Sequence, residues 1–144
     1  MQAVNVSREI YKGFNLTVRT TPIPRVTFDA NYSFLNRNIS GTTGVFPTGT
    51  PKHKTVGTAT LRLPRAVTGI VSLRYESGIV AMSDNNLPLP VAKFATVDLG
   101  GIVPIREGVS LQVGLKNLLN RNYFYWEGFP QAGRNWYATL RYQF

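Results

Sequence analysis

The chain has 144 residues, of which 43% are hydrophobic and 16% charged, and its 16 Lys and Arg against 7 Asp and Glu give a formal net charge of +9. This length suits one domain or a piece of a larger one, and the apolar and aromatic content argues against disorder. The lack of cysteine excludes disulfides, a thiol nucleophile and a cysteine zinc site, and a single histidine, His53, leaves few routes to metal or acid–base chemistry. We therefore expect no enzyme activity and no cofactor.

Apolar and polar residues alternate along most of the chain. Seven segments show this pattern, in chain order 4–19, 26–34, 54–63, 67–76, 95–103, 109–116 and 136–144. A period of two predicts β-strands with one apolar and one polar face, and about ten residues cross a bilayer when a strand is tilted. The first segment breaks the pattern at Arg8 and Lys12, which share the parity of its apolar residues. Because no apolar run is long enough for a membrane helix, any membrane crossing would be made by strands.

The connections between these segments are of two alternating kinds. Short ones at 20–25, 63–66 and 104–108 contain Pro or Gly and a basic residue, whereas long ones at 37–52, 77–91 and 120–134 are rich in Gly, Pro, Asn and aromatic residues. Short periplasmic turns and long outer loops are typical of outer-membrane barrels. The aromatic residues of this sequence gather near both ends of the predicted strands, which matches the two aromatic girdles of such barrels. The sequence therefore predicts an all-β fold, an antiparallel up-and-down transmembrane β-barrel segment of about seven strands.

Two other architectures fit parts of the pattern. A self-contained small outer-membrane barrel with a structural or adhesive role would need eight strands, which fit in about this length. A soluble β-sandwich binding module would also show alternation, because each of its sheets buries one face. The positive charge raises nucleic acid as a partner, but aromatic and basic residues fall on opposite parities within most strands, so we expect no nucleic acid.

The C-terminal third carries a recognisable series of motifs. After the strand 109–116 come Asn117-Leu118-Leu119-Asn120, then Asn122-Tyr123, then Pro130, Gly133 and Arg134, and then a strand that closes on Phe144. This series resembles the C-terminal end of TonB-dependent outer-membrane receptors. Segments 13–36, 51–54 and 87–99 are also similar to strands of that family, although Asn15 stands where an acidic residue is usual.

The resemblance implies a larger protein than this chain. Members of that family are 22-stranded barrels with an internal plug, and they take up scarce ligands such as siderophore-iron, haem or cobalamin with energy delivered through TonB. Residues 1–144 lack a plug domain and a TonB box, so we interpret them as the C-terminal part of the barrel domain, in a Gram-negative-type outer membrane. Seven strands alone leave two open edges, and so we expect no independent transport. The implied partners are membrane lipid and lipopolysaccharide, the rest of the barrel and plug, TonB through the N-terminal part, the barrel assembly machinery, and an iron-siderophore or similar ligand.

Three sets of residues are candidates for specific roles. Leu140, Tyr142 and Phe144 resemble the signal by which the assembly machinery recognises the last strand. The family loop motif comprises Asn117, Leu118, Tyr123, Pro130, Gly133 and Arg134, and we interpret Gly133 and Arg134 first as loop-closing structure. Candidate contacts to the lumen or to an anionic or aromatic ligand are Arg74, Lys116, Arg121, Tyr125, Trp126 and Arg141, although solvation or ordinary ion pairing would also explain each charge.

Overall fold

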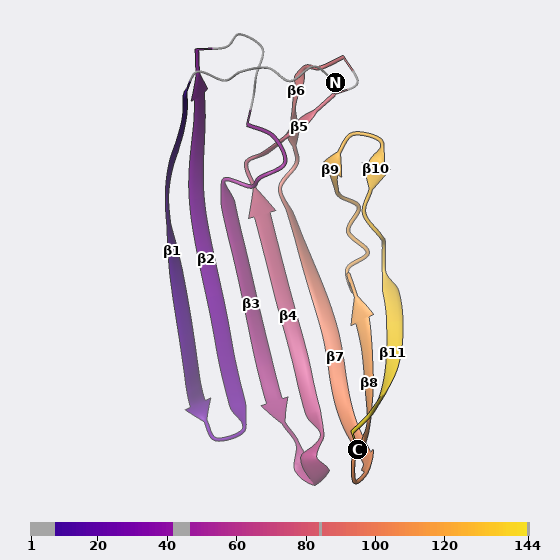
Figure 1. Cartoon of the computed structure of the whole chain (residues 1–144). Coiled ribbons are helices and arrows are strands. Elements are labelled where there is room, and N and C mark those ends of the chain that lie inside the picture. Colours follow the sequence, from indigo (N-terminus) through magenta and orange to yellow (C-terminus); the bar gives the residue numbers. More distant parts are fainter. Residues whose placement is uncertain (1–7, 42–46, 84, 144) are drawn as a thin grey trace.

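The main sheet is one antiparallel layer of seven strands. The computed structural model describes residues 8–41, 47–83 and 85–143. Its strands run in the order β1-β2-β3-β4-β7-β8-β11, so each pairs with its nearest sheet neighbours along the chain (Figure 1). Their bounds are β1 (Arg8–Ile23), β2 (Val26–Ser40), β3 (His53–Arg62), β4 (Thr68–Ser77), β7 (Phe94–Arg106), β8 (Val109–Lys116) and β11 (Asn135–Tyr142). The predicted all-β, up-and-down arrangement is confirmed.

The short and long connections lie at opposite ends of this sheet. Residues 24–25, the 3₁₀ turn η1 (Pro64–Ala66) and residues 107–108 make the short turns. The long connections at the other end contain two small hairpins, β5 (Ile79–Met82) with β6 (Pro88–Val91), and β9 (Phe124–Trp126) with β10 (Phe129–Pro130) (Figure 1). Strand β2 also runs to Ser40, beyond the expected loop start at residue 37, because β1 and β2 stay in register up to the Arg8–Ser40 pair.

The register places apolar side chains opposite apolar side chains across the sheet. Phe14 pairs with Phe34, Val71 with Leu99, and Leu111 with Leu140. Directly opposed residues point to the same face of a sheet, so the alternation seen in single strands becomes one continuous apolar face. Many of its side chains are exposed in the chain alone, as Phe14, Leu73 and Leu140 show at 57%, 44% and 66%. A soluble sandwich would bury such a face, whereas lipid would cover it.

The opposite face is polar and is shaped by glycine near its C-terminal edge. Gly100, Gly114 and Tyr137 are aligned across β7, β8 and β11. The Tyr137 ring lies over Gly114 so closely that a Cβ there would overlap it, and Lys116 Nζ lies 5.4 Å from the centre of the same ring. The missing side chain therefore makes room for a tyrosine that covers this part of the sheet.

The buried core is small and lies at the long-loop end. Among the described residues it consists of Ile79, Ala81, Val91 and Phe94, with Leu89, Tyr123, Phe124 and Tyr125 packed against it. The four core residues come from the β5–β6 hairpin and from the start of β7, and residues of β6 and of the segment 123–125 pack against them. The core thus holds the long connections together and fixes them to the sheet. In residues 8–41, 47–83 and 85–143 no helix is both long and apolar enough to cross a membrane.

Candidate functional site

The polar face is hollowed where it meets the long connections. A cavity of about 230 Å³ lies among side chains of β4, β7, β8 and the last long connection. Its lining residues are Arg74, Thr96, Asp98, Lys116, Asn117, Tyr123, Gln131, Ala132 and Asn135. A smaller hollow of about 120 Å³ shares Asp98 and Lys116 with it and continues along the sheet toward Tyr137. Two cations, the carboxylate of Asp98 and several amide and hydroxyl groups therefore face one space.

A wider cleft adjoins this cavity. It measures about 490 Å³ and is lined by Gly49, Pro51, Lys54, Glu76, Tyr125, Trp126 and Gln131. Gln131 belongs to both spaces, so the cleft and the cavity are neighbours. Trp126 is 52% exposed and leaves an aromatic surface at the cleft. We call the cavity and the cleft together the polar basin.

A buried carboxylate joins the wall of the polar basin to the last long connection. Glu76 is only 2% exposed, and its Oε2 accepts a 2.9 Å hydrogen bond from the Tyr125 hydroxyl. Lys54 Nζ lies 3.7 Å from Glu76 Oε1, an ion pair between adjacent strands. Burial, followed by the hydrogen bond to Glu76, raises the pKa of Tyr125 to about 12, and Arg74 acts in the opposite direction. At neutral pH the Tyr125 hydroxyl is therefore protonated and donates this hydrogen bond.

Aromatic stacking sets the position of the same connection. The Tyr123 and Phe94 rings are stacked with centroids 4.1 Å apart, and Tyr125 meets both edge-on at 5.9 Å. Such pairs stabilise by about 0.5–1.5 kcal/mol beyond the area they bury. Tyr123 and Tyr125, both singled out in the sequence, are thus partly occupied in packing, and their polar edges border the polar basin.

The family loop motif contains a network of side chain to backbone hydrogen bonds centred on Asn117. Asn117 is 5% exposed, and its Nδ2 donates to the carbonyls of Arg121 (2.9 Å) and Ala132 (3.2 Å) while its Oδ1 accepts from Arg121 N (2.8 Å). Its own backbone N–H donates to Asp98 Oδ1 at 2.8 Å. The positive φ of 50° at Asn117 turns the chain out of β8, a conformation that asparagine tolerates well.

Asn120 adds a further hydrogen bond to this network. Its Oδ1 accepts a 2.9 Å hydrogen bond from the backbone N–H of Arg134. A Cβ on Gly133 would lie 2.8 Å from the same oxygen, so the position favours glycine. These contacts join Asn120 to Gly133 and Arg134 at the end of the last long connection. Within the motif, Pro130 belongs to β10, and Leu118 continues the ladder by donating its N–H to Val97 O at 2.7 Å.

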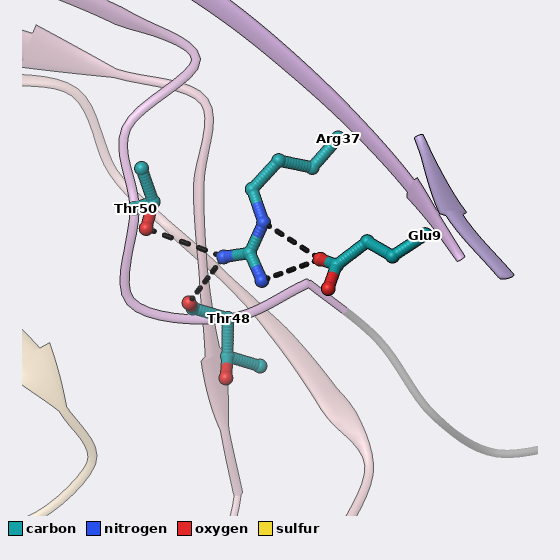
Figure 2. A network of polar contacts seen from close by, with 4 residues as sticks. All are labelled: Glu9, Arg37, Thr48 and Thr50. Carbon is teal, nitrogen blue, oxygen red and sulfur yellow. Dashed lines mark hydrogen bonds and ion pairs between the residues drawn. The ribbon is translucent and has the colours of Figure 1, made fainter. Parts of the chain in front are cut away.

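The first long connection is held by an arginine that sequence reasoning did not single out. Arg37 Nε and Nη2 donate to Glu9 Oε1 at 3.1 and 2.7 Å, and Nη1 donates to Thr48 O and Thr50 Oγ1 at 3.4 and 3.3 Å (Figure 2). The Arg37 guanidinium also lies 5.4 Å from the Tyr11 ring centre. Arg37 thereby links β1, β2 and the end of the first long connection. The only advance signal would have been the Tyr11–Arg37 register pair, which needs the full length of β2.

The remaining candidates separate in space. Arg74, Lys116, Tyr125 and Trp126 gather at the polar basin, whereas Arg121 Nη2 donates to Lys93 O at 3.5 Å. Arg141 pairs with Ser110 at the short-turn end and lines a separate hollow of about 180 Å³. Leu140 and Tyr142 lie exposed on the apolar face of β11, and Phe144 lies outside the described residues. Gln131 was not predicted, because only the fold brings it to the polar basin.

The polar basin combines charged, amide and aromatic groups. Positive charge comes from Arg74, Lys116 and Lys54, and negative charge from Asp98 and Glu76. Asn135 and Gln131 supply amides, and Trp126 supplies an aromatic surface, so the set is able to hold an oxygen-rich molecule or chain segment. In the part of the chain that the structure describes, no three His, Asp or Glu side chains are placed to hold a metal ion.

Known proteins share this fold. No protein-family model and no curated protein matches the chain. Solved structures do match. PiuA, a siderophore receptor from Acinetobacter baumannii, is 17% identical with a TM-score of 0.72, and the match covers 93% of this chain and 22% of PiuA. The ferripyoverdine receptor of the outer membrane of Pseudomonas aeruginosa is 15% identical with a TM-score of 0.71, over 93% of this chain and 19% of that one.

A third solved structure agrees with these two. The ferric-catecholate import receptor Fiu from K12 E. coli is 15% identical with a TM-score of 0.69, over 92% of this chain and 20% of Fiu. The chain thus spans about a fifth of the length of each of these receptors. Its fold is that of a seven-stranded segment of their barrels.

Proposed function

We propose that the chain forms the C-terminal part of the barrel wall of a TonB-dependent outer-membrane receptor that takes up an iron-siderophore or a similar scarce ligand. The observation that carries this proposal is the register of the main sheet, which keeps one face apolar and the other polar across seven strands in the fold of siderophore receptors. A wall between lipid and an aqueous lumen needs such a division, because each of its faces meets a different solvent.

Each part of the chain then has a place in the receptor. The apolar face contacts lipid, the short turns lie in the periplasm, and the long connections face the outside of the cell. The polar basin lies on the lumen side at the outer end, where Arg74 and Lys116 face either the incoming ligand or the plug. Strands β1 and β11 are the edges of the segment and pair with the rest of the barrel, which satisfies their free backbone groups. TonB acts through the N-terminal part of the receptor.

The test uses the full reading frame that contains this segment, expressed in cells deprived of their own siderophore receptors. We expect the product in the outer-membrane fraction and energy-dependent uptake of radiolabelled ferric siderophore. Arg74→Gln with Lys116→Gln should raise the apparent KM several-fold, because both charges face the polar basin, while Arg25→Gln in a periplasmic turn should not. Recovery of the product in a soluble fraction would contradict the membrane assignment, and outer-membrane protein without uptake of any siderophore tested would contradict the transport role.

A further inference from the structure

The polar face has another hollow at the short-turn end, at the opposite end of β8 from Lys116. It measures about 180 Å³, and its walls include Arg106, Ser110, Arg141 and Gln143. Ser110 and Arg141 are directly opposed on β8 and β11 and alternate with the apolar residues of both strands. The register of β7 shifts between Pro104 and Arg106, and such a bulge re-aims nearby side chains. We call this space, beside the turn at residues 107–108, the rim hollow (Figure 1).

The rim hollow is positively charged. Arg106 and Arg141 are both exposed, and none of the ion pairs within the described part of the chain includes either of them. Among the described residues no carboxylate lines the hollow, although Glu107 stands in the adjoining turn. The polar basin differs, because Asp98 and Glu76 stand beside its cations. An anion from outside this segment therefore meets less competition at the rim hollow than at the polar basin.

The cations at the two ends of the sheet are of different kinds. Those at the short-turn end are all arginines, namely Arg19, Arg25, Arg62, Arg65, Arg106 and Arg141. The lysines all lie toward the long connections, at positions 12, 52, 54, 93 and 116. A guanidinium presents a planar fork that matches two oxygens of a carboxylate or phosphate, whereas an ammonium is a point charge. The Ser110 hydroxyl and the Gln143 amide add neutral donors to the rim hollow.

The two spaces lie at opposite ends of one route. If the chain is a barrel wall, its polar face meets the lumen and its short turns meet the periplasm. A ligand that enters at the polar basin then leaves past the rim hollow. Arg62 has the polar parity at the same end of β3, so positive charge continues along this rim. The change from mixed charge at the outer end to positive charge at the inner end favours movement of an anion toward the periplasm.

We infer that the rim hollow is an exit site, where Arg106 and Arg141 bind a carboxylate or phosphate group of the transported ligand after it has left the polar basin. This inference rests on the proposed function, because that function places the short-turn end at the periplasm. It also restricts the ligand to an anionic chelate with a free oxyanion group. A neutral chelate has no group that the two guanidinium forks would recognise.

Thiol labelling tests the rim hollow directly. The chain has no cysteine, so Ser110→Cys places one thiol in the hollow of the full receptor, with any cysteines outside this chain replaced. The purified receptor in neutral detergent is treated with sulfonatoethyl and trimethylammonioethyl methanethiosulfonate, which carry opposite charges. The anionic reagent should react about tenfold faster than the cationic one, because a basic cleft concentrates anions. Citrate should slow the anionic reagent more than sodium chloride at equal ionic strength, since only citrate competes for the guanidinium forks.

Matched variants separate the site from the overall charge. Arg106→Gln/Arg141→Gln, added to Ser110→Cys, should abolish both the preference for the anionic reagent and the protection by citrate. Arg25→Gln/Arg65→Gln removes the same charge from the neighbouring turns and should preserve both. Arg106→Lys/Arg141→Lys should keep the preference but lose most of the protection, because an ammonium lacks the fork. These ratios do not depend on the amount of folded receptor recovered.

Uptake by cells tests the exit role. Arg106→Gln/Arg141→Gln should lower the maximal rate of energy-dependent siderophore uptake several-fold and leave the apparent KM unchanged, because capture takes place at the polar basin. An unchanged maximal rate would overturn the exit role. Unchanged labelling in the Gln variant, or equal effects of citrate and chloride, would remove the site. Slow labelling by both reagents with no effect of citrate would mean that another part of the receptor fills the hollow.

The two proposals fail separately. A wild-type receptor that takes up no siderophore would contradict the proposed function, and thiol labelling of the same protein would still show whether the rim hollow binds oxyanions. Uptake by the wild type together with normal labelling and normal uptake in the Gln variant would leave the proposed function standing and overturn the exit site.

Discussion

The hydroxyl of Tyr125 donates a 2.9 Å hydrogen bond to the buried carboxylate of Glu76, across 49 residues of sequence. One partner lies on a small hairpin of the last long connection and the other on a central strand of the sheet. This bond, together with the Lys54 ion pair, satisfies a charge that would otherwise be costly to bury. It therefore couples the position of a surface loop to the barrel wall.

The first prediction concerns this pair. Tyr125→Phe should destabilise the receptor by about 1–3 kcal/mol, because it leaves a buried acceptor without its donor. Glu76→Gln should destabilise the receptor less, since the amide oxygen still accepts the hydrogen bond and the substitution removes a buried charge. Unfolding in detergent, followed by intrinsic fluorescence, measures both, and the double variant shows whether the effects couple. Additive effects would show that the two side chains act independently.

The second prediction concerns the ionisation of Tyr125. Because the pKa of Tyr125 is raised to about 12, the folded state favours the neutral phenol. Its contribution to stability is complete below the unfolded pKa of about 10 and is lost as pH rises through about 12. The difference in tyrosinate absorbance between wild type and Tyr125→Phe, titrated in alkaline solution, should show one group ionising late. A difference curve centred near pH 10 would contradict the buried contact.

The third prediction concerns Asn117. Asn117→Ala should cost several kcal/mol, because it removes three hydrogen bonds made by a buried side chain and strains a residue at positive φ. Asn117→Gly loses the same hydrogen bonds but adopts that φ easily, so it should be more stable than Asn117→Ala by about 1 kcal/mol. Cleavage by added protease between residues 120 and 134 reports opening of the last connection. Equal stabilities for the two variants would rule out a backbone contribution.

The fourth prediction concerns Arg37. Arg37→Lys keeps the charge but cannot reach Glu9, Thr48 and Thr50 together, because an ammonium lacks the planar fork of a guanidinium. Amide hydrogen exchange at Thr48 and Thr50 should become faster, while exchange in the middle of β2 should not change. Glu9→Gln should produce a smaller effect in the same direction. Unaltered exchange in Arg37→Lys would mean that charge alone holds the connection.

The fifth prediction concerns the end of the chain. If Leu140, Tyr142 and Phe144 form an assembly signal, deletion of Phe144 from the full receptor should reduce its insertion several-fold. Surface labelling of whole cells measures insertion, with Gln143→Ala as a control on the opposite parity of the same segment. Normal surface display of the deleted protein would remove this role.

The sheet could be predicted because its information is local. Alternation in each strand identifies a lipid-facing side, and the register then aligns residues of the same parity, as in the pair Val71 and Leu99. The ends of the strands are harder to predict from the sequence. Asn38 and Ser40 belong to β2 because β1 provides partners for them, and no property of residues 37–40 alone indicates this.

The site was only partly predictable for a related reason. Arg74 and Lys116 stood out by residue type and parity, and Tyr125 and Trp126 as aromatic residues of the last long connection. The fold brings all four to the polar basin. The small hairpins depend on tertiary contacts, chiefly the packing of Phe94 on Tyr123, which join residues far apart in the chain. Such contacts leave no periodic trace in the sequence, so Gln131 gave no signal.

The nearest-neighbour topology described above also implies an order of assembly. Closing residues 24–25 or 107–108 costs little chain entropy, whereas closing the long connection between β8 and β11 costs more. Hairpins β1–β2 and β7–β8 can therefore form early as local units. Strand β11 joins later, when the Asn117 hydrogen-bond network has closed the connection between β8 and β11. Of the seven strands of the main sheet, β11 is thus the one whose docking is most delayed by its own connection.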